Sequence, residues 1–357
     1  MTDRPSYRLF SSCNCDAPLD AGLSRRRFLG GGAALGALAA SGCAVTPGAA
    51  RPHRVDVHHH VVAPDWLAAL KSARRDYPRM STWTPAQSIA DMDAAGIATS
   101  ITSPTEPQVA FMNAQRAAPM ARHANEYAKK LMGDYPGRFG VFAMLPLPHI
   151  DASLKEIEYA FDVLKVDGVG ILTNYGNKWL GHPDFAPVFA ELNRRRAVVY
   201  THPTTPDCCV NLVPGVAAAA VELGADTTRS IANLIFSGAS RRYSDIKFIF
   251  SHGGGVLTSI AERLQYQLIG RPPYESITKA IMDGELQRFY YDTAQVSLSV
   301  TIGALAKLVP TTQILFGTDY PFRTSLEHVQ GLSRAFGPAD LALIDRANAL
   351  RLLPRLA

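Results

Sequence analysis

The chain has 357 residues, 19% of them charged and 47% hydrophobic, and its formal net charge is +5. This small excess of basic residues, with no basic run or aromatic-basic patch after residue 50, argues against a nucleic-acid partner. The residues after position 50, about 300 of them, suffice for one large α/β barrel or two smaller domains. The cysteines of this part, Cys208 and Cys209, are adjacent. Adjacent cysteines rarely bridge each other, so a disulfide scaffold is excluded.

The first fifty residues are predicted to be an export signal and linker rather than part of the fold. Arg25 and Arg26 lie just before a short Gly/Ala-rich apolar run at residues 31–40, which is the pattern of a twin-arginine signal peptide. The run is too short for a transmembrane helix, which needs about 20 apolar residues. The segment that ends at Cys43 resembles a lipobox, so this cysteine is either acylated or removed by ordinary cleavage further along. We therefore expect a protein that is exported by the twin-arginine route and is either free in the periplasm or attached to the membrane by a lipid at Cys43.

Short apolar runs bounded by turns alternate with segments of helical periodicity through residues 51–357. The predicted strands are 54–58, 99–102, 139–145, 168–172, 197–202, 247–252, 289–293 and 314–319. The predicted helices are 85–95, 113–135, 152–165, 185–195, 226–243, 256–269, 299–308 and 325–335, the first with Thr84 as its N-cap and Pro85 at its first position. Eight strands alternating with helices predict parallel βα units that close into a TIM-type (β/α)8 barrel. The alternative is an open doubly wound sheet, which would place its site at one switch point.

Four of the predicted strands end in side chains of types that bind metal ions. Alternate residues on a strand point to the same side, so His58 and His60 aim at one point while the histidine between them faces away. His202, His252 and Asp319 end three further strands, and this rim is where TIM barrels build their active sites. Imidazoles and carboxylates that converge on one rim indicate a divalent metal site, so the sequence predicts a metalloenzyme.

The motifs at these strand ends resemble those of the amidohydrolase-2 family, which includes aminocarboxymuconate-semialdehyde, γ-resorcylate and 6-methylsalicylate decarboxylases. The resemblance covers nearly all of residues 54–330 and is carried by Asp56-Val57-His58-His59-His60, Thr201-His202-Pro203, Ser251-His252-Gly253-Gly254-Gly255 and Gly317-Thr318-Asp319-Tyr320-Pro321-Phe322. The 6-methylsalicylate decarboxylases are the most similar subgroup, through segments that include Trp83-Thr84-Pro85, Asn125-Glu126-Tyr127 and Leu180-Gly181-His182-Pro183.

By this resemblance, one divalent metal ion would be bound by His58, His60, His202 and Asp319. Relatives with two metal ions use a carboxylated lysine at the end of the fourth strand, and the strand at 168–172 ends without a lysine. Three histidines and one carboxylate suit Zn²⁺, whereas Mn²⁺ prefers more oxygen ligands. The resemblance therefore favours zinc, with manganese as the alternative.

The resemblance also implies a reaction. We expect decarboxylation of a small aromatic or unsaturated carboxylic acid similar to 6-methylsalicylate, with His252 or Asp319 as the acid that protonates the carbon carrying the carboxylate. The alternative is hydrolysis of a lactone, ester or amide, with His252 as general base. A third hypothesis is a metal- or ligand-binding lipoprotein without catalysis. The motifs do not separate these outcomes, and the export signal counts against decarboxylation because we expect aromatic-acid decarboxylases of this type to be intracellular.

Four side chains near the predicted rim are candidates for binding the substrate. Arg323 follows Asp319 and is placed to clamp a carboxylate, and Arg79 lies on the long loop after the first strand. Asn174 and Tyr175 follow the fourth strand.

Two acidic residues are lesser candidates. Asp292, at the end of the seventh strand, either supports a metal-binding histidine or caps a turn. Glu106, on the loop after the second strand, is a candidate for lining the pocket by its position alone. The predicted partner is a small carboxylic-acid substrate, and a homodimer is compatible with these predictions.

Overall fold

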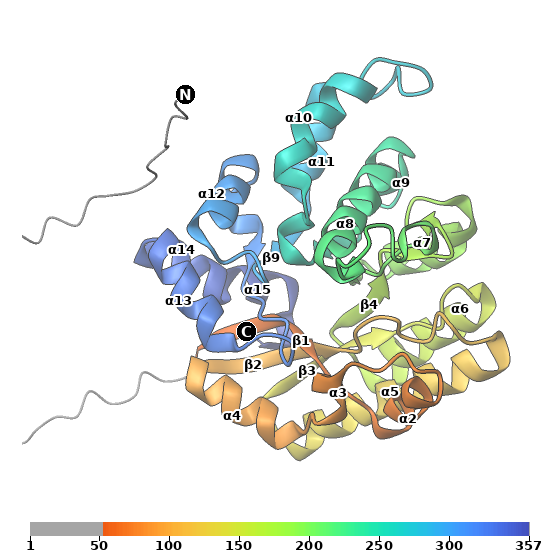
Figure 1. Cartoon of the computed structure of the whole chain (residues 1–357), viewed down its shortest axis with the longest axis vertical. Coiled ribbons are helices and arrows are strands. Elements are labelled where there is room, and N and C mark those ends of the chain that lie inside the picture. The colour runs from red at the N-terminus through yellow and green to blue at the C-terminus, as the bar shows by residue number, and fades with distance from the viewer. Residues whose placement is uncertain (1–52, 357) are drawn as a thin grey trace, which may run out of the picture. The chain divides into compact units, whose positions relative to one another are not determined.

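Eight parallel strands organise the computed structural model, which describes residues 53–356 (Figure 1). The strands are β1 (Arg54–His60), β2 (Ile97–Ser103), β3 (Phe139–Met144), β4 (Gly168–Leu172), β7 (Val198–His202), β8 (Lys247–Phe250), β9 (Tyr290–Asp292) and β10 (Ile314–Leu315). They pair in this order, so all eight predicted strands are confirmed. The predicted export signal and Cys43 lie outside the described residues.

The chain after β10 joins the last strand to the first. The backbone N–H of Val57 donates a hydrogen bond to Phe316 O at 2.9 Å, and that of His60 donates to Tyr320 O at 2.8 Å. These bonds lie between β1 and the segment that carries Asp319, so the sheet curls around on itself. The TIM-type barrel is therefore confirmed, and the open doubly wound sheet is wrong.

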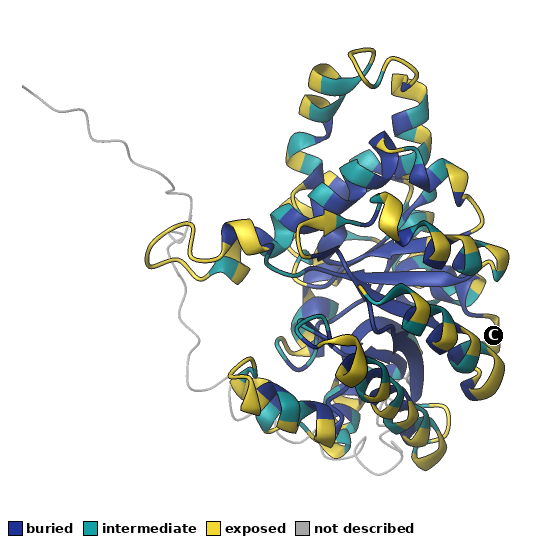
Figure 2. Cartoon of the chain, turned by 90° about the vertical axis from the view of Figure 1, so that its right-hand side faces the viewer, coloured by how far each residue is buried: buried dark blue, intermediate teal, exposed yellow. Residues whose placement is uncertain are grey.

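Apolar side chains fill the inside of the barrel below its rim. Val55, Val57, Phe142, Tyr200 and Leu315 come from four different strands, and each is fully buried in one cluster. A second, larger cluster packs between the strands and the helices. Figure 2 shows the consequence, with buried strands at the centre and exposed residues on the outer faces of the helices. Burial of strands on both faces is what a parallel sheet requires.

Helices cover the outside of the barrel, as the alternating pattern predicts. Their bounds are α2 (Pro64–Ser72), α3 (Pro78–Ser81), α4 (Pro85–Ala95), α5 (Ala114–Asp134), α6 (Ile150–Tyr159), α7 (Ala186–Arg194), α8 (Ala218–Phe236), α9 (Ala239–Arg242), α10 (Leu257–Leu268), α11 (Lys279–Arg288), α12 (Ser299–Leu308), α13 (Ser325–Ala335), α14 (Pro338–Ala342) and α15 (Asn348–Leu352). None of the described helices is both long and apolar enough to cross a membrane.

The local signals of α4 act as the sequence predicts. The Thr84 hydroxyl accepts a hydrogen bond from Gln87 N at 3.2 Å, Pro85 occupies the first turn, and Gly96 ends the helix in the left-handed region at φ 67°. Capping by a threonine and termination by a left-handed glycine each satisfy backbone groups that the helix leaves free.

The helix predicted at 226–243 differs from the structure. Residues Ala218–Phe236 form α8, and Gly238, at φ 74°, separates it from the short α9. The helix begins earlier than predicted because 217–220 is a run of alanines, the best helix former. This early start matters for function, since the first turn of α8 lies beside the metal-binding residues.

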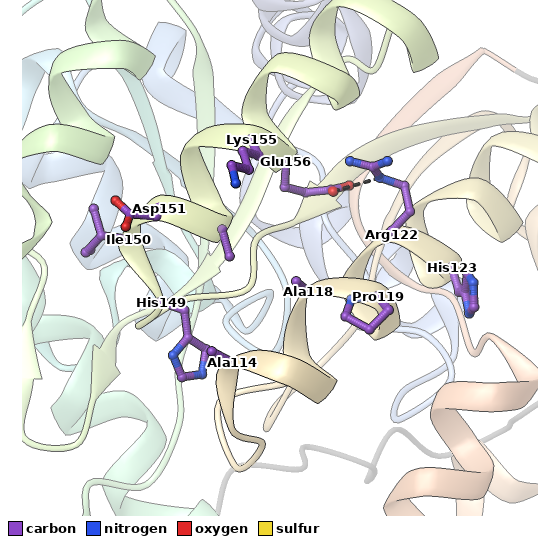
Figure 3. Close-up of a pocket in the computed structure, with 11 residues that line it drawn as sticks. Ala114, Ala118, Pro119, Arg122, His123, His149, Ile150, Asp151, Lys155 and Glu156 are labelled. Carbon is purple, nitrogen blue, oxygen red and sulfur yellow. Dashed lines mark hydrogen bonds and ion pairs between the residues drawn. The ribbon is translucent and has the colours of Figure 1, made fainter.

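One cavity lies on the outside of the barrel, between α5 and α6. It measures about 690 Å³ and is lined in part by Arg122, His149 and Glu156 (Figure 3). Arg122 Nε and Glu156 Oε2 form an ion pair at 2.8 Å, so the central charges of this cavity satisfy each other. None of the predicted metal ligands lines it.

Candidate metal centre and active site

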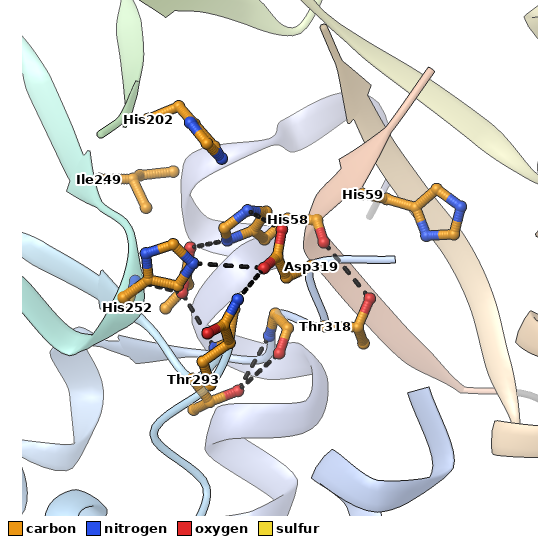
Figure 4. Close-up of polar contacts among 12 residues, drawn as sticks. His58, His59, His202, Ile249, His252, Thr293, Thr318 and Asp319 are labelled. Carbon is orange, nitrogen blue, oxygen red and sulfur yellow. Dashed lines mark hydrogen bonds and ion pairs between the residues drawn. The ribbon is translucent and has the colours of Figure 1, made fainter. Parts of the chain in front are cut away.

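The predicted metal ligands converge at the carboxyl end of the barrel. One ligand atom each from His58, His60, His202 and Asp319 lies within 4.8 Å of all the others, and all four residues are buried. Figure 4 shows the rings of His58 and His202 near the carboxylate of Asp319. Strand ends that are distant in sequence meet here because the parallel barrel brings every strand to the same edge.

The three imidazoles are oriented by their second ring nitrogens. His58 Nδ1 lies 2.8 Å from Asp292 Oδ2, His60 Nδ1 lies 3.1 Å from Ser103 O, and His202 Nδ1 lies 2.8 Å from Pro203 O. Each of these partners accepts a hydrogen bond, so each Nδ1 carries a proton and each Nε2 is the ring atom that is left to bind a metal ion. This is the support that metal-binding histidines have in proteins.

The donor set fits a divalent cation. His58 Nε2 is buried, lies 3.2 Å from Asp319 Oδ1, and has no hydrogen-bond partner among the described residues. His60 Nε2 lies 2.9 Å from the same oxygen. A buried polar nitrogen without a hydrogen-bond partner is costly, and a bound cation would satisfy it. We therefore describe the four side chains as the metal-binding site.

The charges around the site point to the same conclusion. Burial lowers the pKa of His58, but the carboxylates of Asp292 and Asp319 outweigh it and raise the pKa to about 10. Burial lowers the pKa of His60 and, more strongly, that of His202. Burial opposes ionisation of Asp319, but the charge of His58 and the adjacent imidazoles of His252 and His60 hold the pKa of this carboxyl well below its usual range. The carboxylates of the rim thus attract a cation, and the neutral rings of His60 and His202 are able to bind it.

Two buried carboxylates hold the rim together. Asp292 Oδ1 accepts hydrogen bonds from the backbone N–H groups of His252, at 2.9 Å, and Ala294, at 3.0 Å, while its other oxygen holds His58. Asp292 therefore both supports a metal-binding histidine and caps a turn, the two roles that the sequence left open. Asp56 accepts from Thr318 Oγ1 at 2.7 Å and from His58 N at 3.0 Å, which ties β1 to the segment before Asp319.

His59 points away from the metal site, as strand periodicity predicts (Figure 4). Its Nδ1 lies 3.1 Å from Asp56 Oδ2, its Nε2 lies 2.9 Å from Ser88 Oγ, and its ring stacks on Tyr320. The middle histidine of the triplet thus has a structural role, with both ring nitrogens satisfied.

His252 lies beside the four ligands. Its Nε2 is 3.5 Å from Asp319 Oδ2, is buried, and has no hydrogen-bond partner among the described residues. The residue has a left-handed backbone, with φ 53°, and Asp319 shares this feature with φ 62°. Such conformations are unfavourable for side chains of this size and tend to occur where function requires a particular geometry.

A cavity of about 350 Å³ opens above these residues. It is lined by polar and apolar groups, namely Tyr77, Thr105, Glu106, His202, Ala219, Ala220, Leu223, His252, Gln295, Asp319 and Phe322. Its volume is at the lower end of the range for small-molecule sites. No arginine or lysine is among the described residues that line it.

The four residues predicted to bind substrate lie outside this lining. Arg323 is half-exposed and pairs with Glu327 at 2.8 Å, and Arg79 Nη1 donates to Pro321 O at 3.2 Å. Asn174 Nδ2 donates to a carboxylate on α8 at 2.7 Å, and Tyr175 is buried with its hydroxyl oxygen accepting from Leu172 N. Each of the four side chains thus has a partner within the protein.

Sequence reasoning missed Gln295, which follows β9 and lines the cavity. Its side-chain Nε2 donates a hydrogen bond to Asp319 Oδ2. Its backbone N–H donates to His328 Nε2 at 3.0 Å, and His328 Nδ1 in turn donates to Thr324 O at 3.0 Å. A glutamine three residues after a strand end gives no signal of its own, so its role follows from the fold alone.

Comparison with known proteins identifies the family. The family model described as Amidohydrolase matches residues 55–355. A 6-methylsalicylic acid decarboxylase of Aspergillus aculeatus is 33% identical over 322 residues, which cover 85% of this chain and 96% of that protein. A decarboxylase of Aspergillus niger is also 33% identical, over 327 residues that cover 85% of this chain and 88% of that protein. The chain therefore belongs to the amidohydrolase family, as the strand-end motifs predict.

A solved structure supports the same fold. A dihydroxybenzoic acid decarboxylase from a Polaromonas species, with bound manganese and the inhibitor 2-nitroresorcinol, has a TM-score of 0.76 to this structure. The match covers 85% of this chain and 97% of that one, at 22% sequence identity. At this identity the likeness shows the shared barrel and no more.

Proposed function

We propose that the protein is a metal-dependent decarboxylase of a small aromatic carboxylic acid, similar to 6-methylsalicylate. The observation that carries this proposal is the likeness, over most of both chains, to proteins named as decarboxylases. The metal-binding site and the small cavity above it provide what such a reaction needs. The substrate class is taken from those relatives.

Zinc is the metal that we propose for the site, because three imidazoles and one carboxylate are its usual ligands. Manganese, which the Polaromonas enzyme holds, is the alternative. When bound, the metal ion would supply a Lewis acid that polarises and orients the substrate oxygens. Elemental analysis of the purified protein distinguishes the two metals.

His252 is the residue that we propose as the proton donor. The residue lines the cavity, and its Nε2 lies 3.5 Å from Asp319 Oδ2 with no hydrogen-bond partner among the described residues. The protonated imidazole of His252 would donate its proton to the substrate carbon that carries the carboxylate. The bond between that carbon and the carboxylate then breaks, its electron pair returns to the aromatic ring, and CO₂ leaves. Asp319 is the alternative donor.

The cavity walls would hold the aromatic ring during this step. Ala219, Ala220 and Leu223, at the start of α8, and Phe322 contribute apolar surface around the polar centre. Contact with these side chains would exclude water from the ring face, so the proton would come from His252 rather than from solvent.

The test is a panel of ortho-hydroxybenzoates, lactones and aryl esters, assayed in parallel for CO₂ release and for acid production. CO₂ from a salicylate-type substrate supports the proposal. Acid from a lactone or ester without CO₂ would contradict it and identify a hydrolase. His252→Ala should reduce turnover by about 10²- to 10⁴-fold and keep the metal, whereas His123→Ala, at an exposed histidine of α5, is the matched control and should change neither.

We also propose that the protein is exported by the twin-arginine route. The support is the sequence pattern of Arg25 and Arg26 before a short apolar run. Cell fractionation should find the Arg25→Lys plus Arg26→Lys variant in the cytoplasm, and normal delivery of this variant would refute the proposal. The mass of the mature N-terminus would show whether Cys43 is acylated.

A further inference from the structure

One carboxylate in the cavity has no part in the metal site. Glu106 lies on the loop after β2, is 8% exposed, and lines the cavity. Its Oε1 accepts a hydrogen bond from the Tyr77 hydroxyl at 2.6 Å, and Tyr77 lines the cavity too. Among residues 53–356 no further hydrogen bond or ion pair engages the Glu106 side chain, so Oε2 remains able to accept a hydrogen bond.

The direction of this hydrogen bond is determined by chemistry. Burial and the nearby charge of Glu106 both raise the pKa of Tyr77 above its ordinary value, so the phenol keeps its proton and donates. Glu106 is therefore the acceptor. The described residues that line this cavity include no arginine or lysine, so on this side a ligand would supply the complementary group for the carboxylate. Arg74 and Arg75 lie on the other side of Glu106 and Tyr77, where they line a neighbouring cavity.

Glu106 and Tyr77 lie close to the metal site. The Phe322 ring contacts both His60 and Tyr77, with ring centroids 5.6 Å apart in each case. The residue before Glu106 is Thr105, whose hydroxyl lies 3.4 Å from His202 Nε2. A single aromatic ring bound at the metal site would thus have one edge near the Glu106 carboxylate.

The charges decide which edge this is. A carboxylate repels the carboxylate of an acidic substrate, which would face the cationic end of the cavity at the metal site. The opposite or lateral edge of the ring would then meet Glu106. A methyl group there would leave Glu106 Oε2 without a donor, whereas a hydroxyl or amine would satisfy this oxygen.

We propose that Tyr77 and Glu106 form a specificity subsite that binds a hydrogen-bond donor, a phenolic hydroxyl or an amine, on the ring of an aromatic carboxylic acid. This inference rests on the proposed function and narrows its substrate class. Glu106 recognises the donor directly, and Tyr77 positions the carboxylate and occupies its other oxygen.

The test compares pairs of salicylates that carry either a hydroxyl or a methyl group at the same one of the four remaining ring positions. The metal-loaded full chain is assayed for CO₂ release, as kcat/KM, and for ligand binding by calorimetry, as Kd. We expect the hydroxyl compound to be preferred at one or more positions by about 10- to 100-fold, the range of a hydrogen bond to a charged group. Binding is measured independently of turnover, so the subsite is tested even if no CO₂ is released.

Variants connect the preference to Glu106. Glu106→Leu should remove the preference for the hydroxyl, and the nearly isosteric Glu106→Gln should weaken it, with normal metal content in both. Glu327→Gln removes a carboxylate that lies outside the cavity and should leave the preference unchanged.

Three results would overturn the inference. They are equal or better binding of the methyl compounds at every ring position, a preference that persists in Glu106→Leu, and no binding of any compound by the metal-loaded protein. Absence of CO₂ with a normal Kd preference would instead refute the decarboxylase and leave the subsite in place.

Discussion

Replacement of Asp292 by asparagine should weaken metal binding, although Asp292 is not a ligand. All three groups that donate to this carboxylate are N–H groups, namely His58 Nδ1 and the backbone nitrogens of His252 and Ala294. An asparagine accepts through one oxygen, so in either orientation its NH₂ group faces one of these donors. If the NH₂ group faces His58, the imidazole must adopt the other tautomer, which places a proton on Nε2, where the metal ion binds.

The expected loss of metal affinity is about 10- to 100-fold, the range for groups that orient metal-binding histidines, or about 1.4–2.8 kcal/mol. The assay is a metal titration against a competing chelator at constant pH. Asp226→Asn is the matched control, because Asp226 is also buried and accepts from Asn174 and Trp179 but contacts no ligand. Both variants should lose stability, and Asp292→Asn alone should lose metal affinity. Equal affinity in Asp292→Asn and the wild type would refute the reasoning.

The remaining predictions concern the ligands and pH. His58→Ala combined with His60→Ala should abolish metal binding by elemental analysis, and full retention of metal would contradict the assignment. Burial lowers the pKa of His328, whose neutral ring accepts from the Gln295 backbone. The neutral ring therefore contributes fully to the free energy of unfolding above the unfolded-state pKa of about 6.5. This contribution is lost as the pH falls below that value, because the unfolded chain then binds a proton that the folded protein does not. Denaturant unfolding at several pH values should therefore show a smaller difference between His328→Gln and the wild type at pH 5 than at pH 8. A constant difference would show that protonation of His328 does not affect folding.

The barrel and the convergence of metal-binding side chains at its rim could be predicted from the sequence because both follow from local periodicity. The choice of the four ligands came from the family resemblance, because His252 ends a strand in the same way. A strand has a period of two, so His58 and His60 share a side whatever surrounds them. Parallel strands bring their carboxyl ends to one rim, so His202 and Asp319 reach the same point once eight strands are counted. The helix start at Thr84 is equally local, since a cap needs only its own first turn.

The environment of the metal site was decided by the tertiary structure. Arg323 follows Asp319 in the sequence, but in the structure it pairs with a glutamate one helical turn later and is not among the residues that line the cavity. Glu106 and Gln295 are ordinary loop residues in the sequence, and their roles depend on Tyr77 and Asp319, which are distant along the chain. The path of a loop depends on packing against segments that local periodicity does not encode. The sequence by itself therefore determined the fold and the candidate metal ligands, whereas the lining of the cavity beside them was decided by the folded structure.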